Sequence, residues 1–138
     1  MSTFIIENVA DLPGAAQYLL PMIKSCSTVA LSGELGAGKT SLVKAICTQL
    51  DVIDDVSSPT FSLINTYVTK DGVRIHHVDL YRLKTLEEAL EIGIEDYLNR
   101  DELTLIEWPE LIGQLLPDDT LHLSLEHMDK ERRKIVIL

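Results

Sequence analysis

The sequence predicts an α/β fold: a mixed sheet with a parallel core and antiparallel edge strands, flanked by helices. Three observations support this. A β-type run at 28–31 leads through a glycine-rich loop into apolar residues at helical spacing up to Leu50. An Asp-Gly pair at 71–72 joins two further β-type runs, which predicts an antiparallel hairpin. A mainly apolar run at 103–107 follows a helical segment, and such alternation of strands and helices indicates parallel pairing.

Length and composition limit the possible functions. With 138 residues, 46% hydrophobic composition and no internal repeat, we expect one domain over residues 1–138. The net charge of −10 argues against a broad electrostatic surface for nucleic acid, so work on nucleic acid would need a basic partner. No basic region precedes the first apolar residues, and no apolar run approaches the roughly 18 residues of a membrane span, so we expect a cytoplasmic protein. Cys26 and Cys47 are too few for a disulfide framework and are expected to be reduced thiols.

The first elements are predicted to be a short strand and a helix. Residues 4–6 are β-type, and Asp11 is the expected N-cap of a helix that tolerates Pro13 in its first turn. Pro21 is expected to disturb the end of this helix. The side chains expected to face the core are Ala15, Tyr18, Leu19 and Met22.

Residues 33–40 fit the phosphate-binding pattern G-x-x-x-x-G-K-S/T between a strand and a helix, which makes the expected fold P-loop NTPase-like. Glycines let successive N–H groups point at phosphate oxygens, Lys39 adds a cation for the β- and γ-phosphates, and Thr40 supplies a hydroxyl ligand for Mg²⁺. The alternative is an ordinary glycine-rich turn. In that case the lysine, the hydroxyl and the flanking strand and helix would occur together by chance. The residues expected to contact the nucleotide here are Gly33, Glu34, Leu35, Gly36, Ala37, Gly38, Lys39, Thr40 and Ser41.

A polar loop at 51–59 and a hairpin follow the phosphate-loop helix. Thr60 is placed to sense the γ-phosphate as switch segments do, although turn or strand-start chemistry would also explain it. The hairpin strands are predicted at 62–68 and 73–81.

The second hairpin strand carries titratable side chains on both faces. Asp79 lies at the strand end, where a carboxylate could orient water or Mg²⁺; the alternative is an exposed acid paired with Arg82. His76 and His77 point to opposite faces, so a structural role is favoured over a metal site.

Residues 85–88 have the capping-box pattern and predict a helix that ends at Gly93, with a short further turn at 94–98. The side chains expected to face inward are Leu86, Ala89 and Leu90.

The run at 103–109 predicts a buried strand that ends in an acid, as a Walker B strand does. Glu107 there could hold Mg²⁺ or polarise water, or it could be an edge-strand acid. Trp108 is either a core residue or a wall beside the nucleotide.

The last third of the chain predicts a short helical piece at 110–115 and a closing antiparallel pair of strands at 120–126 and 134–138. A basic cluster lies between these strands and is either a solvated hairpin turn or a phosphate or partner contact. Its members are Lys130, Arg132, Arg133 and Lys134.

Four motifs together resemble the bacterial TsaE (YjeE) family. They are Gly-Glu-Leu-Gly-Ala-Gly-Lys-Thr-Ser at 33–41, Ser-Pro-Thr-Phe at 58–61, His-Val-Asp-Leu-Tyr-Arg at 77–82 and Leu-Ile-Glu-Trp-Pro-Glu at 105–110. The resemblance covers nearly the whole chain, with no departure inside the motifs. It implies a small ATPase required for threonylcarbamoylation of adenosine 37 in tRNAs that read codons beginning with A, acting with TsaD and TsaB partners.

The resemblance also implies roles for single residues and a slow, Mg²⁺-dependent hydrolysis activated in a partner complex. Lys39 would contact phosphates, Thr40 and Glu107 would serve Mg²⁺, Asp79 would be a catalytic or water-positioning acid, and Thr60 would be the switch residue. ATP and Mg²⁺ are the expected cofactors, and tRNA would be contacted mainly through the partners. Two alternatives stay open: a P-loop small-molecule kinase, for which the chain leaves little room for a lid, and a non-catalytic ATP-dependent assembly switch.

Overall fold

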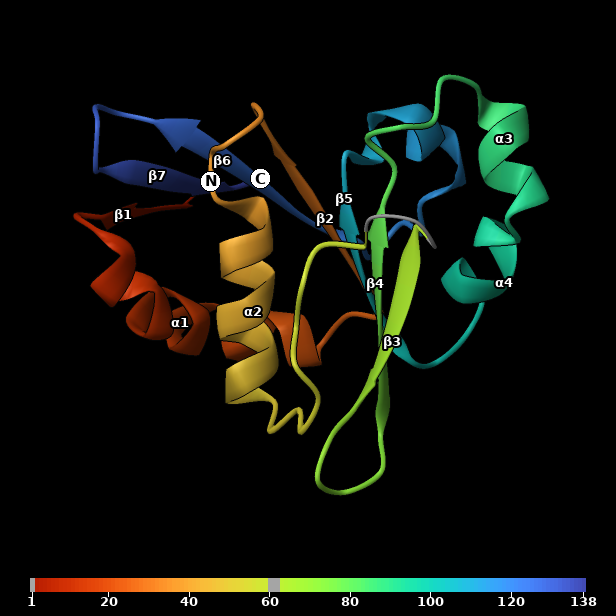
Figure 1. Ribbon diagram of the computed structural model, residues 1–138, viewed down its shortest axis with the longest axis horizontal. Coiled ribbons are helices and arrows are strands. Elements are labelled where there is room, and N and C mark those ends of the chain that lie inside the picture. Colours follow the sequence, from red (N-terminus) through yellow and green to blue (C-terminus); the bar gives the residue numbers. More distant parts are fainter. Residues whose placement is uncertain (1, 60–62) are drawn as a thin grey trace.

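The structure is a computed structural model that describes residues 2–59 and 63–138 (Figure 1). Its strands form a seven-stranded sheet in the order β1-β7-β6-β2-β5-β4-β3. The strands are β1 (Ser2–Ile6), β2 (Thr28–Gly33), β3 (Ile64–Val68), β4 (Arg74–Asp79), β5 (Leu103–Glu107), β6 (Leu121–His127) and β7 (Arg133–Ile137). The helices are α1 (Leu12–Lys24), α2 (Lys39–Gln49), α3 (Leu86–Glu91) and α4 (Ile94–Leu98), with 3₁₀ helices at Val9–Asp11 and Pro109–Leu115.

The centre of the sheet is parallel and both sides end in antiparallel strands. Strand β2 pairs in parallel with β5 and β6, and β5 pairs in parallel with β4. The pairs β3–β4, β6–β7 and β1–β7 are antiparallel. This arrangement confirms the predicted mixed sheet. The closing pair is antiparallel as predicted, and it lies between β2 and β1, so that β1 is the outermost strand on that side.

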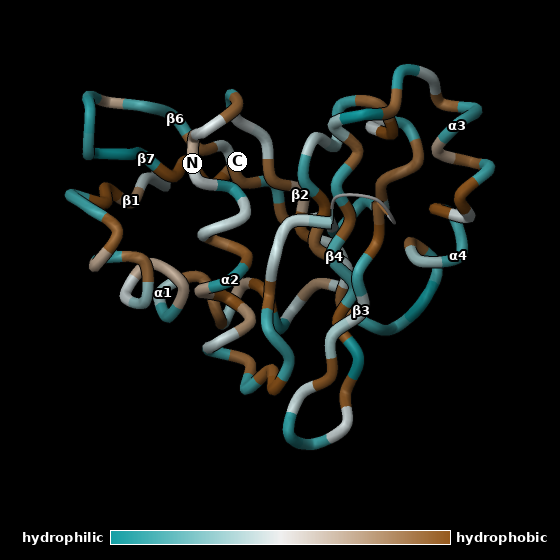
Figure 2. The backbone as a smooth tube through the Cα atoms, viewed as in Figure 1, coloured by the Kyte–Doolittle hydropathy of each residue, from teal (hydrophilic) through white to brown (hydrophobic). Residues whose placement is uncertain are grey.

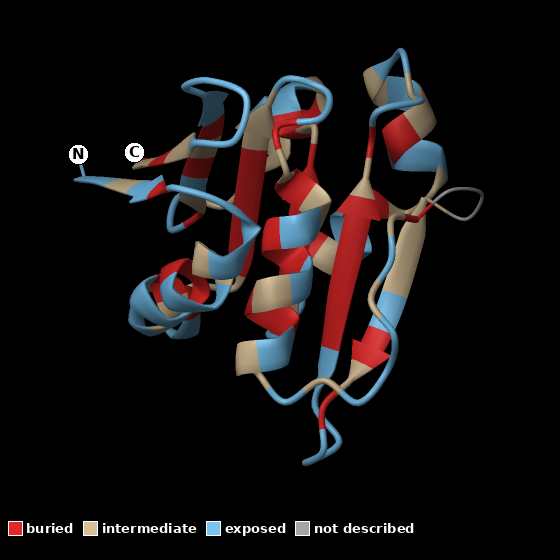
Figure 3. Ribbon diagram, turned by 60° about the vertical axis from the view of Figure 1, so that its left-hand side comes forward, coloured by how far each residue is buried: buried red, intermediate tan, exposed pale blue. Residues whose placement is uncertain are grey.

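Helices cover both faces of the sheet. Helices α1 and α2 pack on one face, and α3, α4 and the 3₁₀ helix at 109–115 pack on the other (Figure 1). The alternation along β4 serves both cores, because Ile75 belongs to the first core and Val78 to the second. Strands β2 and β4 are buried along most of their length (Figure 3). Hydrophobic stretches follow the central strands, whereas the turn between β6 and β7 is mainly hydrophilic (Figure 2).

The first helix differs from its prediction in three respects. Asp11 occupies the N-cap position, but its carboxylate makes no capping bond and instead accepts a hydrogen bond from the N–H of Glu7 at 2.8 Å. Tyr18 was expected in the core but is 47% exposed, because the buried face of the helix passes beside it. Pro21 does not end the helix, since the buried Ile23 anchors a further turn on the core. The buried residues of this helix are Ala15, Ala16, Leu19 and Ile23.

The capping box at Thr85 is present as predicted. The hydroxyl of Thr85 accepts from the N–H of Glu88 at 3.2 Å, and the Glu88 carboxylate accepts from the N–H of Thr85 at 3.1 Å. Ala89 is buried, but Leu90 is 39% exposed, because this short helix turns only one narrow face to the sheet. Gly93, with φ of 81°, allows the chain to reverse into α4.

Across the described residues, no helix is both long and apolar enough to cross a bilayer.

Candidate functional site

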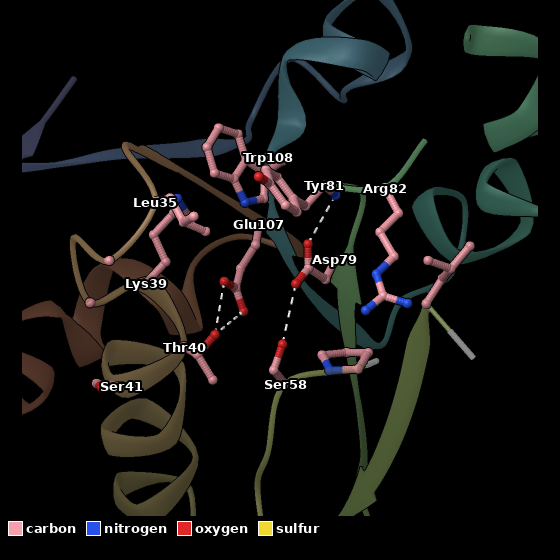
Figure 4. Close-up of a pocket in the computed structure, with 14 residues that line it drawn as sticks. Leu35, Lys39, Thr40, Ser41, Ser58, Asp79, Tyr81, Arg82, Glu107 and Trp108 are labelled. Carbon is pink, nitrogen blue, oxygen red and sulfur yellow. Dashed lines mark hydrogen bonds between the residues drawn. The ribbon is translucent and has the colours of Figure 1, made fainter. Parts of the chain in front are cut away.

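A cavity of about 430 Å³ lies at the carboxyl ends of the parallel strands β2, β4 and β5 (Figure 4). This is the edge at which ligands bind in open α/β sheets, because the loops that follow neighbouring parallel strands converge there. The phosphate loop forms one wall, the end of the 51–59 loop forms another, and the strand ends form the floor. The predicted residues that line the cavity are Leu35, Gly36, Gly38, Lys39, Thr40, Ser41, Asp79, Glu107 and Trp108.

The phosphate loop has the backbone conformation that its glycines permit. Gly33, Gly36 and Gly38 have φ values of 150°, 81° and 101°, and Gly38 is the N-cap of α2. The start of α2 lines the cavity, and the first N–H groups of a helix have no acceptor within the helix itself. A Cβ on Gly33 would lie 2.6 Å from the carbonyl oxygen of Leu125, so this glycine is also required by close packing against β6.

Lys39 connects the loop to the opposite wall. Its ammonium donates hydrogen bonds to the carbonyl oxygens of Gly33 and Glu34, the latter at 3.2 Å. The same ammonium lies 3.7 Å from the centroid of the Trp108 ring. Burial lowers the pKa of Lys39, while the nearby carboxylates, Glu107 first, act in the opposite direction. Gly33 and Glu34 thus support the lysine rather than line the cavity.

Trp108 is a wall of the cavity and also packs, partly buried, against the second core. It follows Glu107 with φ of 58° and ψ of 57°, a left-handed conformation that a bulky residue seldom adopts. Its ring packs against Tyr81, with 4.9 Å between the ring centroids. The two aromatic rings therefore form one side of the cavity mouth (Figure 4).

Thr40 and Glu107 meet on the cavity floor. The Thr40 hydroxyl oxygen lies 2.9 Å from both carboxylate oxygens of Glu107, which is only 3% exposed. Nε2 of His77 lies 2.6 Å from Oε2 of the same carboxylate. In the part of the chain that the structure describes, no three His, Cys, Asp or Glu side chains gather as a metal site. One hydroxyl and one carboxylate beside a phosphate loop form a donor set that suits Mg²⁺. This ion takes its remaining ligands from phosphate oxygens and water.

Asp79 lies beside Glu107, because the two residues are paired in register between β4 and β5. Its Oδ1 accepts from the N–H of Tyr81 at 3.0 Å, and its Oδ2 accepts from the hydroxyl of Ser58 at 3.3 Å. Burial raises the pKa of Asp79, and the Glu107 charge raises it further, while the hydrogen bonds from Tyr81 and Ser58 lower it. The result is a carboxylate with increased basicity that faces the cavity.

The two histidines point to opposite faces of β4, as predicted. Nδ1 of His76 lies 2.9 Å from the Thr66 hydroxyl and its Nε2 lies 2.8 Å from Glu102, and the ring packs edge-on against Tyr97. His77 faces the cavity floor. Both side chains have hydrogen-bonding partners at each ring nitrogen.

Several lining residues were not predicted from the sequence as site residues. Ser58, Leu63, Tyr81 and Arg82 line the cavity, and three of them lie inside the motifs quoted above. Thr60, the predicted sensor, lies outside the described residues, although its neighbour Pro59 lines the cavity.

A second cavity of about 180 Å³ lies on the other side of the phosphate loop. It shares Gly36, Gly38 and Ser41 with the first, and the predicted Ala37 lines it as well. Chain-distant residues complete it, namely Ile6, Asn8, Val9, Leu12, Leu125, Glu131 and Arg133. Apart from Arg133, no local pattern marks these residues, because the sheet order alone brings β1 and the β6–β7 hairpin to the loop.

The basic cluster is divided between the exposed turn, which holds Lys130 and Arg132, and the start of β7, which holds Arg133 and Lys134. Arg132 pairs with Asp129 at 2.7 Å, and Lys134 lies 3.5 Å from Glu126. Arg133 also lines the second cavity, which leaves a ligand contact open for this residue.

Comparisons with known proteins give the similarity of the chain in family and in fold. The family model described as "Threonylcarbamoyl adenosine biosynthesis protein TsaE" matches residues 6–135. Two relatives named tRNA threonylcarbamoyladenosine biosynthesis protein TsaE come from Rickettsia felis and Bacillus subtilis. The first is 38% identical, over 97% of this chain and 78% of the relative, and the second is 31% identical, over 93% and 79%. The crystal structure of Bacillus subtilis YdiB shares the fold, with a TM-score of 0.76 and 24% identity over 99% of this chain and 83% of that chain.

Proposed function

The chain belongs to the TsaE family, named for threonylcarbamoyl adenosine biosynthesis, and on this premise we propose that it binds and hydrolyses ATP with Mg²⁺ to support that tRNA modification. One observation carries the proposal. The cavity beside the phosphate loop brings together a lysine, a hydroxyl and two carboxylates, which are Lys39, Thr40, Asp79 and Glu107. These are the groups that phosphoryl transfer to water requires.

The loop suits a triphosphate for reasons of backbone and charge. Around Gly36 and Gly38 the space that a Cβ would take is open, so the backbone can approach phosphate oxygens closely. The N-terminus of α2 adds partial positive charge. Phosphate oxygens would compete with the loop carbonyls for the Lys39 ammonium, which hydrogen-bonds those carbonyls in this structure.

Thr40 and Glu107 would hold Mg²⁺, since their oxygens already lie together on the cavity floor. When bound, Mg²⁺ neutralises phosphate charge and so favours displacement at the γ-phosphorus. The burial of Glu107 keeps its carboxylate from rotating into solvent.

Asp79 would accept the proton of the attacking water. The Tyr81 N–H holds Oδ1, so Oδ2 is the atom available to the cavity, and the Ser58 hydroxyl can yield this position. As the water oxygen bonds to the γ-phosphorus, the bond to the bridging oxygen breaks, the water proton passes to Oδ2, and ADP and phosphate result.

The second cavity is the proposed place for the nucleoside part of ATP. It adjoins the phosphate loop on the side away from Asp79, and it combines apolar Val9 and Leu12 with polar Asn8 and Arg133. A base needs apolar contacts and hydrogen-bonding groups, and the lining of this cavity offers both.

We propose that the chain works with TsaD and TsaB in the cytoplasm, and that these partners hold the tRNA. The net charge of −10 supports this division, because such a chain attracts a phosphate backbone poorly. Hydrolysis would then drive repeated cycles of the assembly rather than the transfer itself.

The test combines purified partners, unmodified tRNA, the threonylcarbamoyl donor, ATP and Mg²⁺ with and without this chain. We expect the chain to raise the number of tRNA molecules modified per partner complex well above one. Lys39→Ala should abolish the stimulation. Equal modification with and without the wild-type chain would contradict the proposed function.

A further inference from the structure

The Glu107 carboxylate is held by His77, the first residue of the motif at 77–82, for which the sequence predicted only a structural role. His77 is fully buried, and its Nε2 lies 2.6 Å from Oε2 of Glu107. Thr40 contacts both oxygens of the same carboxylate. The direction in which Glu107 presents its oxygens to the cavity therefore depends on the histidine ring behind it.

The other ring nitrogen of His77 connects it to Tyr67 on the neighbouring strand. Nδ1 lies 3.0 Å from the Tyr67 hydroxyl, and the ring centroids are 5.9 Å apart. In the register of β3 and β4, Asn65 pairs with His77 and Tyr67 pairs with Ile75, so the two rings are diagonal neighbours on one face. Tyr67 is itself only 4% exposed.

Tyr67 in turn holds the loop that forms the opposite wall. Its hydroxyl donates to the carbonyl oxygen of Ser57 at 2.9 Å, and the Ser57 N–H approaches the same hydroxyl at 3.4 Å. The Ser57 carbonyl and the Glu107 carboxylate can only accept, so they take protons from the Tyr67 hydroxyl and from Nε2 of His77, and the direction of the contact between Tyr67 and Nδ1 follows the tautomer of His77. The next residue, Ser58, contacts Asp79.

We propose that Tyr67 and His77 are positioning residues that couple the 57–58 segment to the Glu107 carboxylate. A movement of this segment towards or away from a bound nucleotide changes the position of the Tyr67 hydroxyl, and through His77 the orientation of Glu107. This inference rests on the proposed function, in which Glu107 binds Mg²⁺. Through Tyr67 and His77, a nucleotide that contacts the 57–58 segment would change how tightly Glu107 binds Mg²⁺.

The chain contains a matched control one residue away. Thr66, His76 and Glu102 repeat the same arrangement of hydroxyl, buried histidine and carboxylate on the opposite face of β4, away from the cavity. His76 is 1% exposed and His77 0%. Substitutions in this second set disturb a buried histidine equally without touching Glu107.

The experiment compares the affinity for a non-hydrolysable ATP analogue in Mg²⁺ and in EDTA by calorimetry, and uses the ratio of the two affinities. Tyr67→Phe keeps the ring and removes the hydroxyl, so we expect the ratio to fall about three- to tenfold with the EDTA affinity unchanged. His77→Gln keeps a donor that can reach Glu107 but loses the link to Tyr67, and should give a similar fall. Adding Tyr67→Phe to His77→Gln should then produce no further change, because both variants break the same connection.

Controls and a spectroscopic readout separate coupling from general damage. Thr66→Val and His76→Gln should leave the ratio unchanged, whatever they do to thermal stability. Tyr67→Phe should shift the ¹⁵N signals of the His77 ring and leave those of His76 in place. An unchanged ratio in Tyr67→Phe and His77→Gln, with a wild-type chain that binds the analogue, would overturn the inference alone. A wild-type chain that binds no analogue would overturn the proposed function, and the inference with it.

Discussion

The ammonium of Lys39 lies 3.7 Å from the centroid of the Trp108 ring, so the lysine of the phosphate loop contacts the residue that follows Glu107. A cation over the face of an indole ring is attracted by the ring quadrupole, by about 0.5–2 kcal/mol. Phosphate oxygens would compete for the same cation. Trp108 is thereby placed to report whether Lys39 is engaged elsewhere.

The first prediction uses this contact, since Trp108 is the single tryptophan of the chain. Addition of ATP and Mg²⁺ should change the intensity of tryptophan emission, because Lys39 leaves the ring for the phosphates. A fluorescence titration measures this directly. Constant emission at ATP concentrations that give binding heat in calorimetry would show that Lys39 does not move.

Lys39→Ala should weaken ATP binding by about 10- to 100-fold, the effect expected for losing charged hydrogen bonds. The fold should persist, because the substitution removes a buried ammonium whose pKa burial has lowered. Lys44→Ala is the matched control, since Lys44 lies on the exposed side of the same helix. Calorimetry gives the ATP affinity of each variant. Equal affinities of the two variants would show that Lys39 does not bind the nucleotide.

Asp79→Asn should reduce hydrolysis by about 100-fold or more and leave ATP affinity within a few-fold, as expected for loss of a general base. The Asn side chain can still accept from Tyr81, so the loop geometry is kept. The carboxylate is the active form, and burial raises its pKa above the ordinary value of 3.8. As the pH is lowered, the wild-type hydrolysis rate should therefore begin to fall at a higher pH than it would with an aspartate of ordinary pKa. Full turnover by the Asn variant would assign the proton transfer to another group.

The same raised pKa predicts a stability effect of definite sign. The folded protein binds the Asp79 proton more tightly than the unfolded chain, so this stabilisation is present below pH 3.8 and is lost as pH rises through the raised folded pKa. Asparagine does not titrate in this range, so the Asp79→Asn variant does not lose stability at this position as the pH rises. Its melting temperature relative to wild type should therefore be higher at neutral pH than at acid pH.

Gly33→Ala should destabilise the fold by about 1–3 kcal/mol, because a Cβ would lie 2.6 Å from the backbone oxygen of Leu125 and φ is 150°. Gly14→Ala provides the contrast: this helical glycine has open space around it, so alanine should stabilise by about 0.5–1 kcal/mol. Urea denaturation gives both values. Similar effects at the two sites would contradict the packing of the loop against β6.

Cys47 should resist alkylation in the folded protein. Burial raises the pKa of its thiol to about 12, and burial also raises the pKa of the Cys26 thiol. Because the thiolate is the reactive form, iodoacetamide at pH 8 should modify the partly exposed Cys26 first and Cys47 only on unfolding. Mass spectrometry of time points identifies the order, and early labelling of Cys47 would reveal local opening of α2.

Much of the fold could be predicted from short stretches of sequence. The phosphate loop at 33–40, the hairpin around Gly72 and the capping box at Thr85 all appear in the structure. These features depend on residues within one turn or one hairpin of each other. The predictions for Tyr18 and Leu90 were wrong, because helical spacing gives the width of a buried face only approximately and the packed sheet decides which residues lie at its border.

The sequence by itself determined which residues carry the chemistry: the loop with Lys39 and Thr40, and acids at two strand ends. Only the tertiary structure decided which of them meet. The register of β4 on β5 places Asp79 beside Glu107, and the position of β5 next to β2 brings Glu107 to Thr40, 67 residues away in the chain. Strand order and register are set by the packing of both cores at once, so no local pattern encodes these contacts or the link from His77 through Tyr67 to the loop.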